Sequence, residues 1–104
     1  MKKNENNETL QADATLRLAD CMYMLKDFNG AVKKYNEYIA QYSSMADYAT
    51  YQKAMIEGAM GNYQNKSLTL QKAINNFPNS SYQPAFMYEL GNAYLATNRN
   101  ENAL

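Results

Sequence analysis

The sequence predicts an all-α fold of five helices and a truncated sixth, and three observations support this. Strand formers are scarce, whereas Ala, Leu, Met, Gln, Lys and Glu are abundant; the valines and isoleucines number four, Val32, Ile39, Ile56 and Ile74. Apolar residues recur at the three- and four-residue spacing of helices. Matching positions are separated by 35 and then 37 residues, which indicates an internal repeat.

The chain has 104 residues, which is enough for one small domain. Residues 1–8 are polar, and we expect them to be disordered. The remainder, residues 9–104, is expected to form a single domain of about two and a half repeats. The predicted repeat units are 9–43, 44–80 and 81–104.

Two helices are predicted in the first unit, separated by a break at residues 26–30. The first begins near Glu8, and its predicted core face consists of Ala14, Leu18, Ala19, Met22 and Leu25. Asp27 or Asn29 is suited to cap the second helix. The apolar stripe of that helix recurs at i, i+4, i+7 and i+11 and consists of Ala31, Tyr35, Tyr38 and Tyr42.

The second unit is predicted to contain helices at about residues 45–60 and 63–77. The first of these should pack on two sides, because Tyr48, Tyr51, Met55 and Ala59 share one face and Ile56 and Met60 another. Gly61 is suited to the positive φ of a helix C′ position. The core face of the next helix contains Leu70, Ala73, Ile74 and Phe77, and Pro78 ends it.

A fifth helix is predicted at about residues 82–97, with Pro84 in its first turn. Its predicted core face consists of Met87, Leu90, Gly91 and Tyr94. Residues 98–100 are expected to form a turn, after which residues 101–104 begin a sixth helix one turn long.

Two of the units share a spaced motif. The last unit contains Leu90-Gly91-x-x-Tyr94, with Ala103 twelve residues after the glycine. The first contains Leu18-Ala19-x-x-Met22, with Ala31 at the same offset. These motifs resemble the tetratricopeptide repeat (TPR), and the resemblance covers about residues 12–104.

The second unit resembles the repeat less closely, although it keeps Ala54, Tyr63, Ala73 and Pro78 at the expected places. It has Lys66 where the small residue of the second helix belongs, so we expect that helix to be shifted or packed less closely. The unit ends in Phe77-Pro78-Asn79-Ser80, which resembles the repeat variant common in bacterial envelope proteins.

The resemblance implies a right-handed superhelix of antiparallel helix pairs with a concave groove. It also implies that Ala19, Ala54 and Gly91 let the two helices of each unit approach closely. A sixth helix of one turn would leave the fifth uncovered. The chain is therefore expected to be a fragment of a longer protein or to have an end-to-end partner.

In TPR proteins the first helix of each unit lines the concave face. Carried over unit by unit, the resemblance assigns the groove to Leu16, Asp20, Tyr23, Tyr51, Met55, Tyr88 and Asn92. Tyrosine offers a large contact area and methionine adapts to varied partners, which suits an extended or helical peptide. The alternative is that these residues only complete the packing between repeats. A carboxylate clamp is not expected, because only Asn92 falls on a clamp-type position and the required lysines are missing.

Composition argues against an enzyme and against several ligands. The chain has no histidine, and its single cysteine, Cys21, lies mid-helix among small and apolar residues, where we expect a buried, inert thiol. Asp13, Asp20 and Asp27 recur every seven residues but are too far apart to share one ion, so neither a metal nor a cofactor is expected. Ten basic and ten acidic residues balance, which argues against nucleic acid and anionic membranes as partners.

These observations predict a non-enzymatic scaffold that binds a protein or peptide segment in a concave groove. The alternative is a purely structural section of a longer array that forms homo-oligomers through its uncapped C-terminal end. The chain's start has no apolar leader segment, so the cytoplasm is the default compartment. The envelope-type resemblance favours the periplasm or cell envelope if the chain comes from a longer exported protein.

Overall fold

In the computed structural model the chain forms five α-helices, and the described residues contain no strand. The structure describes the backbone of residues 2–103 and, within it, the side chains of residues 7–98. In chain order the helices are α1 (Lys2–Met24), α2 (Phe28–Gln41), α3 (Ala46–Ala59), α4 (Tyr63–Asn76) and α5 (Gln83–Ala103). The predicted all-α fold class is confirmed.

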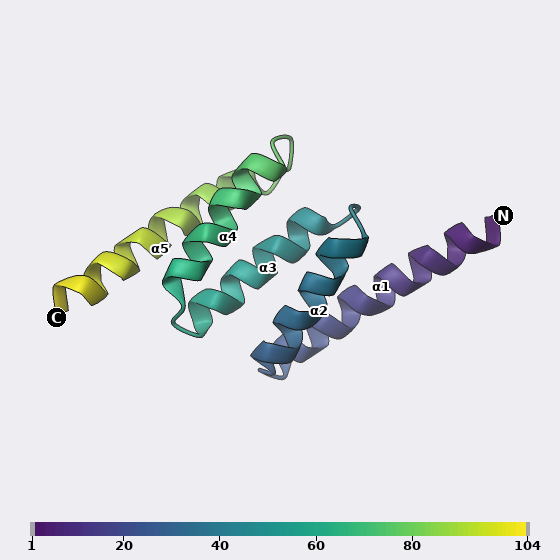
Figure 1. The fold of residues 1–104 in the computed structure, drawn as a ribbon, viewed down its shortest axis with the longest axis horizontal. Helices are drawn as coiled ribbons and strands as arrows, with labels where there is room; N and C mark the ends of the chain where they lie inside the picture. Colours follow the sequence, from purple (N-terminus) through teal and green to yellow (C-terminus); the bar gives the residue numbers. More distant parts are fainter. Residues whose placement is uncertain (1, 104) are drawn as a thin grey trace.

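The helices form an elongated stack with extents of 58 × 31 × 16 Å. Each helix packs mainly against the helix that follows it in the chain (Figure 1). A closed bundle would bring α1 and α5 together, whereas these two helices lie at opposite ends of the stack (Figure 1). The stack therefore has two end faces, one formed by α1 and the other by α5.

Short turns join the helices, and several helices begin or end where the sequence predicted. The Asp27 carboxylate accepts a hydrogen bond of 3.2 Å from the backbone N–H of Gly30 and so caps α2. Gly61 has a φ of 79°, as predicted for the residue after α3. Pro84 is the second residue of α5, where its missing N–H removes no helical hydrogen bond.

Lys26 occupies, after α1, the position that Gly61 occupies after α3. Its φ is 64°, which is in the left-handed region. The Asp27 N–H donates to the carbonyl of Met22 at 2.8 Å, which is the six-to-one hydrogen bond that closes a Schellman motif. A side chain in the left-handed region costs about 1–2 kcal/mol, because its Cβ crowds the backbone. Lys26 therefore holds a conformation that glycine would adopt without this cost.

We expect Lys26→Gly to raise the free energy of unfolding by about 1 kcal/mol, because it relieves this crowding. Urea denaturation measured by circular dichroism would detect the change. The matched control is Gly61→Ala, which introduces the same crowding after α3 and should lower the free energy of unfolding by about 1 kcal/mol. A loss of stability in Lys26→Gly would contradict the left-handed assignment.

Two hydrophobic cores hold the stack together. The first core lies among α1, α2 and α3 and contains the buried residues Ala19, Ala31, Tyr35, Tyr38, Ala49 and Ile56. The second core lies among α3, α4 and α5 and contains Ala54, Leu70, Ala73 and Phe86. Helix α3 contributes to both cores, which confirms that it packs on two sides. The predicted apolar stripes of α2 and α4 face these cores.

The core-facing side of α1 differs from the prediction. Ala12, Leu16 and Tyr23 pack around the first core with Ala19. Leu18 and Leu25, which were predicted to face inward, are 43% and 81% exposed. Met22 packs against the first core, as predicted.

Helix α5 shows the same kind of difference. Phe86 and Ala93 are fully buried, and Leu90 packs against the second core as predicted. Met87 and Tyr94, predicted to face inward, are 56% and 45% exposed. A Cβ added at Gly91 would meet nothing within 4 Å, so the predicted close approach of a neighbouring helix at this glycine is wrong.

The position of α1 and α5 in the stack explains both errors. Each of these helices carries apolar residues on two faces, as a helix inside a repeat array does. Each forms an end of the stack and is covered on one side only (Figure 1). Periodicity identifies both apolar faces but does not indicate which one the chain itself covers.

The helices extend further at both termini than predicted. Helix α5 continues to Ala103, so the expected turn at residues 98–100 and the separate sixth helix are wrong. A four-residue segment gains too few hydrogen bonds to offset the cost of starting a new helix, whereas continuing α5 needs no new start. Helix α1 begins at Lys2 and not near Glu8, since lysine and glutamate are favourable helix formers. Met1 and Leu104 lie outside the described residues.

Candidate functional site

A cleft of about 360 Å³ lies between α1 and α3, the first helices of the first two units. We call it the α1–α3 cleft. Its lining residues are Asp20, Tyr23, Met24, Tyr48 and Gln52. Two of them, Asp20 and Tyr23, are among the groove residues predicted from the sequence.

A hydrogen-bonded cluster forms the polar part of this cleft. The buried hydroxyl of Tyr35 on α2 donates to Oδ1 of Asp20. The hydroxyl of Tyr48 on α3 donates to the same oxygen at 3.0 Å, and Gln52 Nε2 donates to the Tyr48 oxygen at 3.3 Å. Asp20 thus connects α1 to α2 and α3 through two phenols.

The pKa values of both phenols are raised. Burial is the larger cause, and the hydrogen bond to the Asp20 carboxylate is the second, because an anionic phenolate would be desolvated and repelled there. Together they raise the pKa of Tyr48 to about 12 and that of Tyr35 still further. Both hydroxyls therefore remain neutral donors at neutral pH.

These shifts predict a loss of stability in alkali. The ordinary pKa of tyrosine is 10.0, so above about pH 10 the unfolded chain loses protons that the native Tyr48 retains until about pH 12. The free energy of unfolding should therefore be constant from about pH 7 to 9 and fall above about pH 10. Urea denaturation at several pH values would measure this fall, which should be shallower in Tyr48→Phe. Equal slopes for the two proteins would contradict the assignment.

The other predicted groove residues occupy different surroundings. Leu16 packs against the first core, as Tyr23 also does, and Tyr51 packs against the second core. Met55 is half-buried on α3, whereas Tyr88, at 69%, and Asn92 are exposed on α5. The structure brings Asp20 and Tyr23 together in one cleft, and the other five lie outside that cleft.

An aromatic cluster connects α3 to the start of α5. The ring of Tyr51 lies 5.5 Å from that of Tyr82 and 6.5 Å from that of Phe86. Tyr82 and Phe86 stack at 6.2 Å. Tyr51 therefore contributes to packing between repeats. Its burial there is the main cause that raises the pKa of its hydroxyl.

A buried ion pair connects α4 to α5 at the second repeat interface. Lys66 Nζ lies 2.9 Å from Glu89 Oε1, and the side chains are 8% and 13% exposed. Gly58 makes room for the lysine, because a Cβ at residue 58 would lie 3.0 Å from Lys66 Cδ. Lys66 is thus accommodated at a small-residue position by the glycine opposite it.

Side chains at equivalent positions of the two repeat interfaces differ in size. Ala31 of the first unit is equivalent to Lys66 of the second, 35 residues later. Tyr23 is equivalent to Gly58 at the same spacing. Gln52 becomes Glu89 after 37 residues. The ion pair was not predicted from the sequence. Gly58 could have indicated it, because this glycine is at the position that Tyr23 occupies in the first unit. Tyr48 and Gln52 were also missed as cleft residues; both lie on the α3 face that includes Met55.

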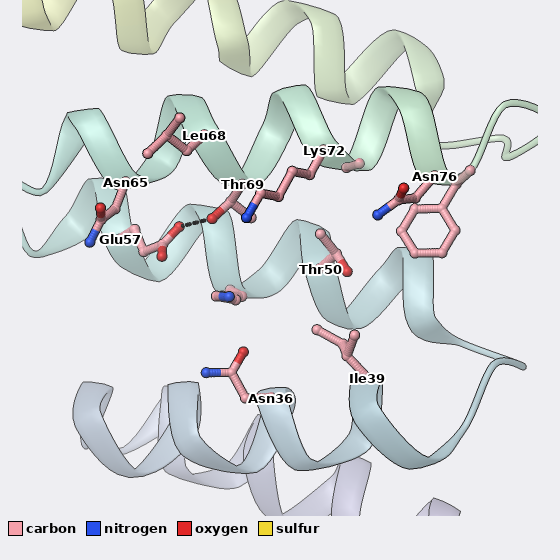
Figure 2. A pocket seen from close by; sticks show the side chains of 12 residues that line it. Asn36, Ile39, Thr50, Glu57, Asn65, Leu68, Thr69, Lys72 and Asn76 are labelled. Atoms are coloured by element: carbon pink, nitrogen blue, oxygen red, sulfur yellow. Dashed lines mark hydrogen bonds between the residues drawn. The ribbon is translucent and has the colours of Figure 1, made fainter.

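A second cleft, also of about 360 Å³, lies on the opposite side of α3 (Figure 2). We call it the α2–α4 cleft. Its lining residues are Asn36, Ile39, Thr50, Lys53, Glu57, Asn65, Leu68, Thr69, Lys72, Ala73, Asn76 and Phe77. The Thr69 hydroxyl donates to Glu57 Oε1 at 2.7 Å across the cleft (Figure 2). This cleft is mainly polar and includes no residue of α1 or α5.

The cysteine and the acidic residues are the other chemical groups considered from the sequence. Cys21 is exposed, so the predicted buried thiol is wrong; it lies on the outer face of α1 and not on its core face. Within residues 7–98, no three acidic, cysteine or histidine side chains are grouped as metal ligands would be. No helix in the described part of the chain is long and apolar enough to span a bilayer.

The architecture defines an all-α helical repeat protein, in which successive helices stack in one direction. A sequence model of the family described as Tetratricopeptide repeat matches residues 13–44 and 48–80, which is more than half of the chain. The chain therefore belongs to the TPR family, whose repeats generally mediate protein–protein interactions. No curated protein and no solved structure shows a significant match to the chain.

The matched ranges correspond closely to the first two predicted units. They include the second unit, whose sequence is the less regular of the two, and they stop before residues 81–104. In this last segment the structure describes one helix, α5.

Proposed function

We propose that this chain is a non-enzymatic scaffold that binds a peptide or protein segment along the face formed by the first helices α1, α3 and α5. The α1–α3 cleft is the observation that carries the proposal, since it combines apolar walls with hydrogen-bonding groups on that face. The exposed Tyr88 and Asn92 extend the same predicted face onto α5. A segment lying across the three helices would contact all of these side chains.

A library of arrayed peptides would test this proposal, with the affinity of selected peptides measured by fluorescence anisotropy. Tyr88→Ala and Asn92→Ala should each weaken binding about fivefold or more, because tyrosine is a typical contact residue and the asparagine amide can both donate and accept hydrogen bonds. The matched control is Leu68→Ala, which removes an exposed side chain from the α2–α4 cleft. Weaker binding in the control, with unchanged binding in the α5 variants, would contradict the proposed face.

We also propose that the chain belongs to the repeat variant found in bacterial envelope proteins. The Phe77-Pro78-Asn79-Ser80 ending of the second unit supports this. The flanking sequence of the full gene product would test it. An export leader would support a periplasmic or envelope location, whereas an N-terminal region with no leader would favour the cytoplasm.

One observation favours an alternative function, which is a structural section that self-associates through its end faces. Met87, Tyr94 and Leu95 are 45–57% exposed on α5, Leu10 and Leu18 are exposed on α1, and Leu25 is exposed directly after α1. Apolar stripes of this kind are typical of interaction surfaces. Association of the α5 face of one molecule with the α1 face of another would continue the stack.

Sedimentation velocity over a range of protein concentrations would test the alternative. If the chain self-associates through α5, Leu95→Glu should shift it to monomer. Leu68→Glu places the same charge on an exposed leucine of α4 and should have no such effect. A monomeric wild-type chain would eliminate this alternative and would leave the groove proposal unaffected.

A further inference from the structure

We propose that the α1–α3 cleft selects a basic side chain, lysine or arginine, of the bound segment, and that Asp20 is its ion-pair partner. This inference rests on the proposed function and specifies the chemistry of one contact within it. The occupant would place its cation at the Asp20 carboxylate, with the rings of Tyr23 and Tyr48 and the side chain of Met24 around it.

The charge at Asp20 is the first argument. Both hydrogen bonds to this carboxylate come from neutral phenols and end on Oδ1. Among residues 7–98 the ion pairs are Lys34–Glu37 and Lys66–Glu89, so no lysine or arginine in this part of the chain pairs with Asp20. Arg17 lies one turn earlier on α1 and is exposed, without an ion pair to Asp20. A lysine or arginine of the partner would therefore neutralise the charge of the Asp20 carboxylate.

The shape and chemistry of the walls provide the second argument. A volume of about 360 Å³ is at the small end of ligand sites, which suits one long side chain. Tyr23 and Tyr48 both line the cleft, and an aromatic ring attracts a cation that lies over its face. Met24 is 82% exposed at the rim and can contact the aliphatic stem of a lysine or arginine. The cleft thus has a surface for each part of such a side chain.

The second repeat interface provides an internal comparison. There Glu89, which corresponds to Gln52, already has a cation from the chain itself, Lys66 at 2.9 Å. At the first interface the position equivalent to Lys66 is Ala31, and at the second interface the position equivalent to Asp20 is Met55. The second interface therefore has a matched ion pair within the chain, whereas Asp20 has no such partner among residues 7–98.

A titration followed by NMR would test the cleft without any knowledge of the partner. The probe is N-acetyl-arginine amide, and its neutral isostere N-acetyl-citrulline amide is the control. We expect the arginine probe to shift the amide resonances of Tyr48 and Gln52 in a saturable manner, whereas the citrulline probe does not. Asp20→Asn should abolish the shift, because it keeps an oxygen for the two phenols and removes the charge.

The peptide library provides the second measurement. Wild-type protein should select lysine or arginine at one fixed position, and replacing that residue by glutamine should weaken binding about tenfold. Asp20→Asn should lose this preference, whereas Tyr88→Ala should bind all peptides more weakly and keep it. Unfolding curves for Asp20→Asn would separate a folding defect from a binding defect.

The outcomes distinguish the two proposals. Peptides that bind the predicted face with no preference for a basic residue would overturn the Asp20 assignment and leave the proposed function intact. Equal shifts with the arginine and citrulline probes would also overturn it. Failure to bind any peptide would instead contradict the proposed function, and the small-probe titration would still decide the chemistry of the cleft.

Discussion

Lys66→Ala is expected to lower the free energy of unfolding by about 3 kcal/mol, because it leaves Glu89 in a nearly buried site without its cation. The alanine would also leave empty the space between Gly58 and Glu89 that the lysine stem fills. Urea denaturation followed by circular dichroism measures the change. Lys72→Ala is the matched control on the same helix, and its loss should stay within about 0.5 kcal/mol because Lys72 is exposed.

A double variant separates the charge from the packing in this pair. Lys66→Met combined with Glu89→Met removes both charges and keeps most of the volume. Such replacements of buried ion pairs are often neutral or stabilising, so the double variant should recover most of the stability lost in Lys66→Ala. If Lys66→Ala alone costs less than about 1 kcal/mol, the pair is far more hydrated than the structure indicates.

Phe86→Ala is expected to lower the free energy of unfolding by about 4 kcal/mol, since Phe86 is fully buried and its loss leaves a cavity in the second core. Its ring contacts those of Tyr51, Phe77 and Tyr82, so the cavity would lie where α3, α4 and α5 meet. Urea denaturation again provides the measurement.

The neighbouring residue is the control for this variant. Met87 was predicted to face the core, but it is 56% exposed. Met87→Ala should therefore change the free energy of unfolding by no more than about 0.5 kcal/mol. A larger loss in Met87→Ala than in Phe86→Ala would mean that α5 is rotated relative to its position in the structure.

The fold was predictable from the sequence where a helix has one apolar stripe. The stripes of α2 and α4 face the cores as expected, and the Asp27 cap and the Gly61 turn occur at the predicted residues. The prediction failed at α1 and α5, since each has two apolar faces and only one of them is covered by this chain. Leu18 and Met87 were chosen as core residues for that reason and are exposed.

The candidate site was predictable in part. The resemblance to the TPR family selected Asp20 and Tyr23, both of which line the α1–α3 cleft. It did not select Tyr48 or Gln52, because their role depends on how closely α3 approaches α1, and spacing alone does not specify this distance. The hydrogen bond between Tyr48 and Asp20 spans 28 residues of sequence and became visible only in the folded chain.

The proposed function requires that a partner segment binds on the face formed by α1, α3 and α5. Amide shift mapping by NMR with a library-selected peptide tests this claim most directly. We expect the largest shifts at residues of the α1–α3 cleft, such as Tyr23 and Gln52, and at Asn92 on α5. Largest shifts at Asn36, Thr69 and Asn76, on the α2–α4 side, would contradict it.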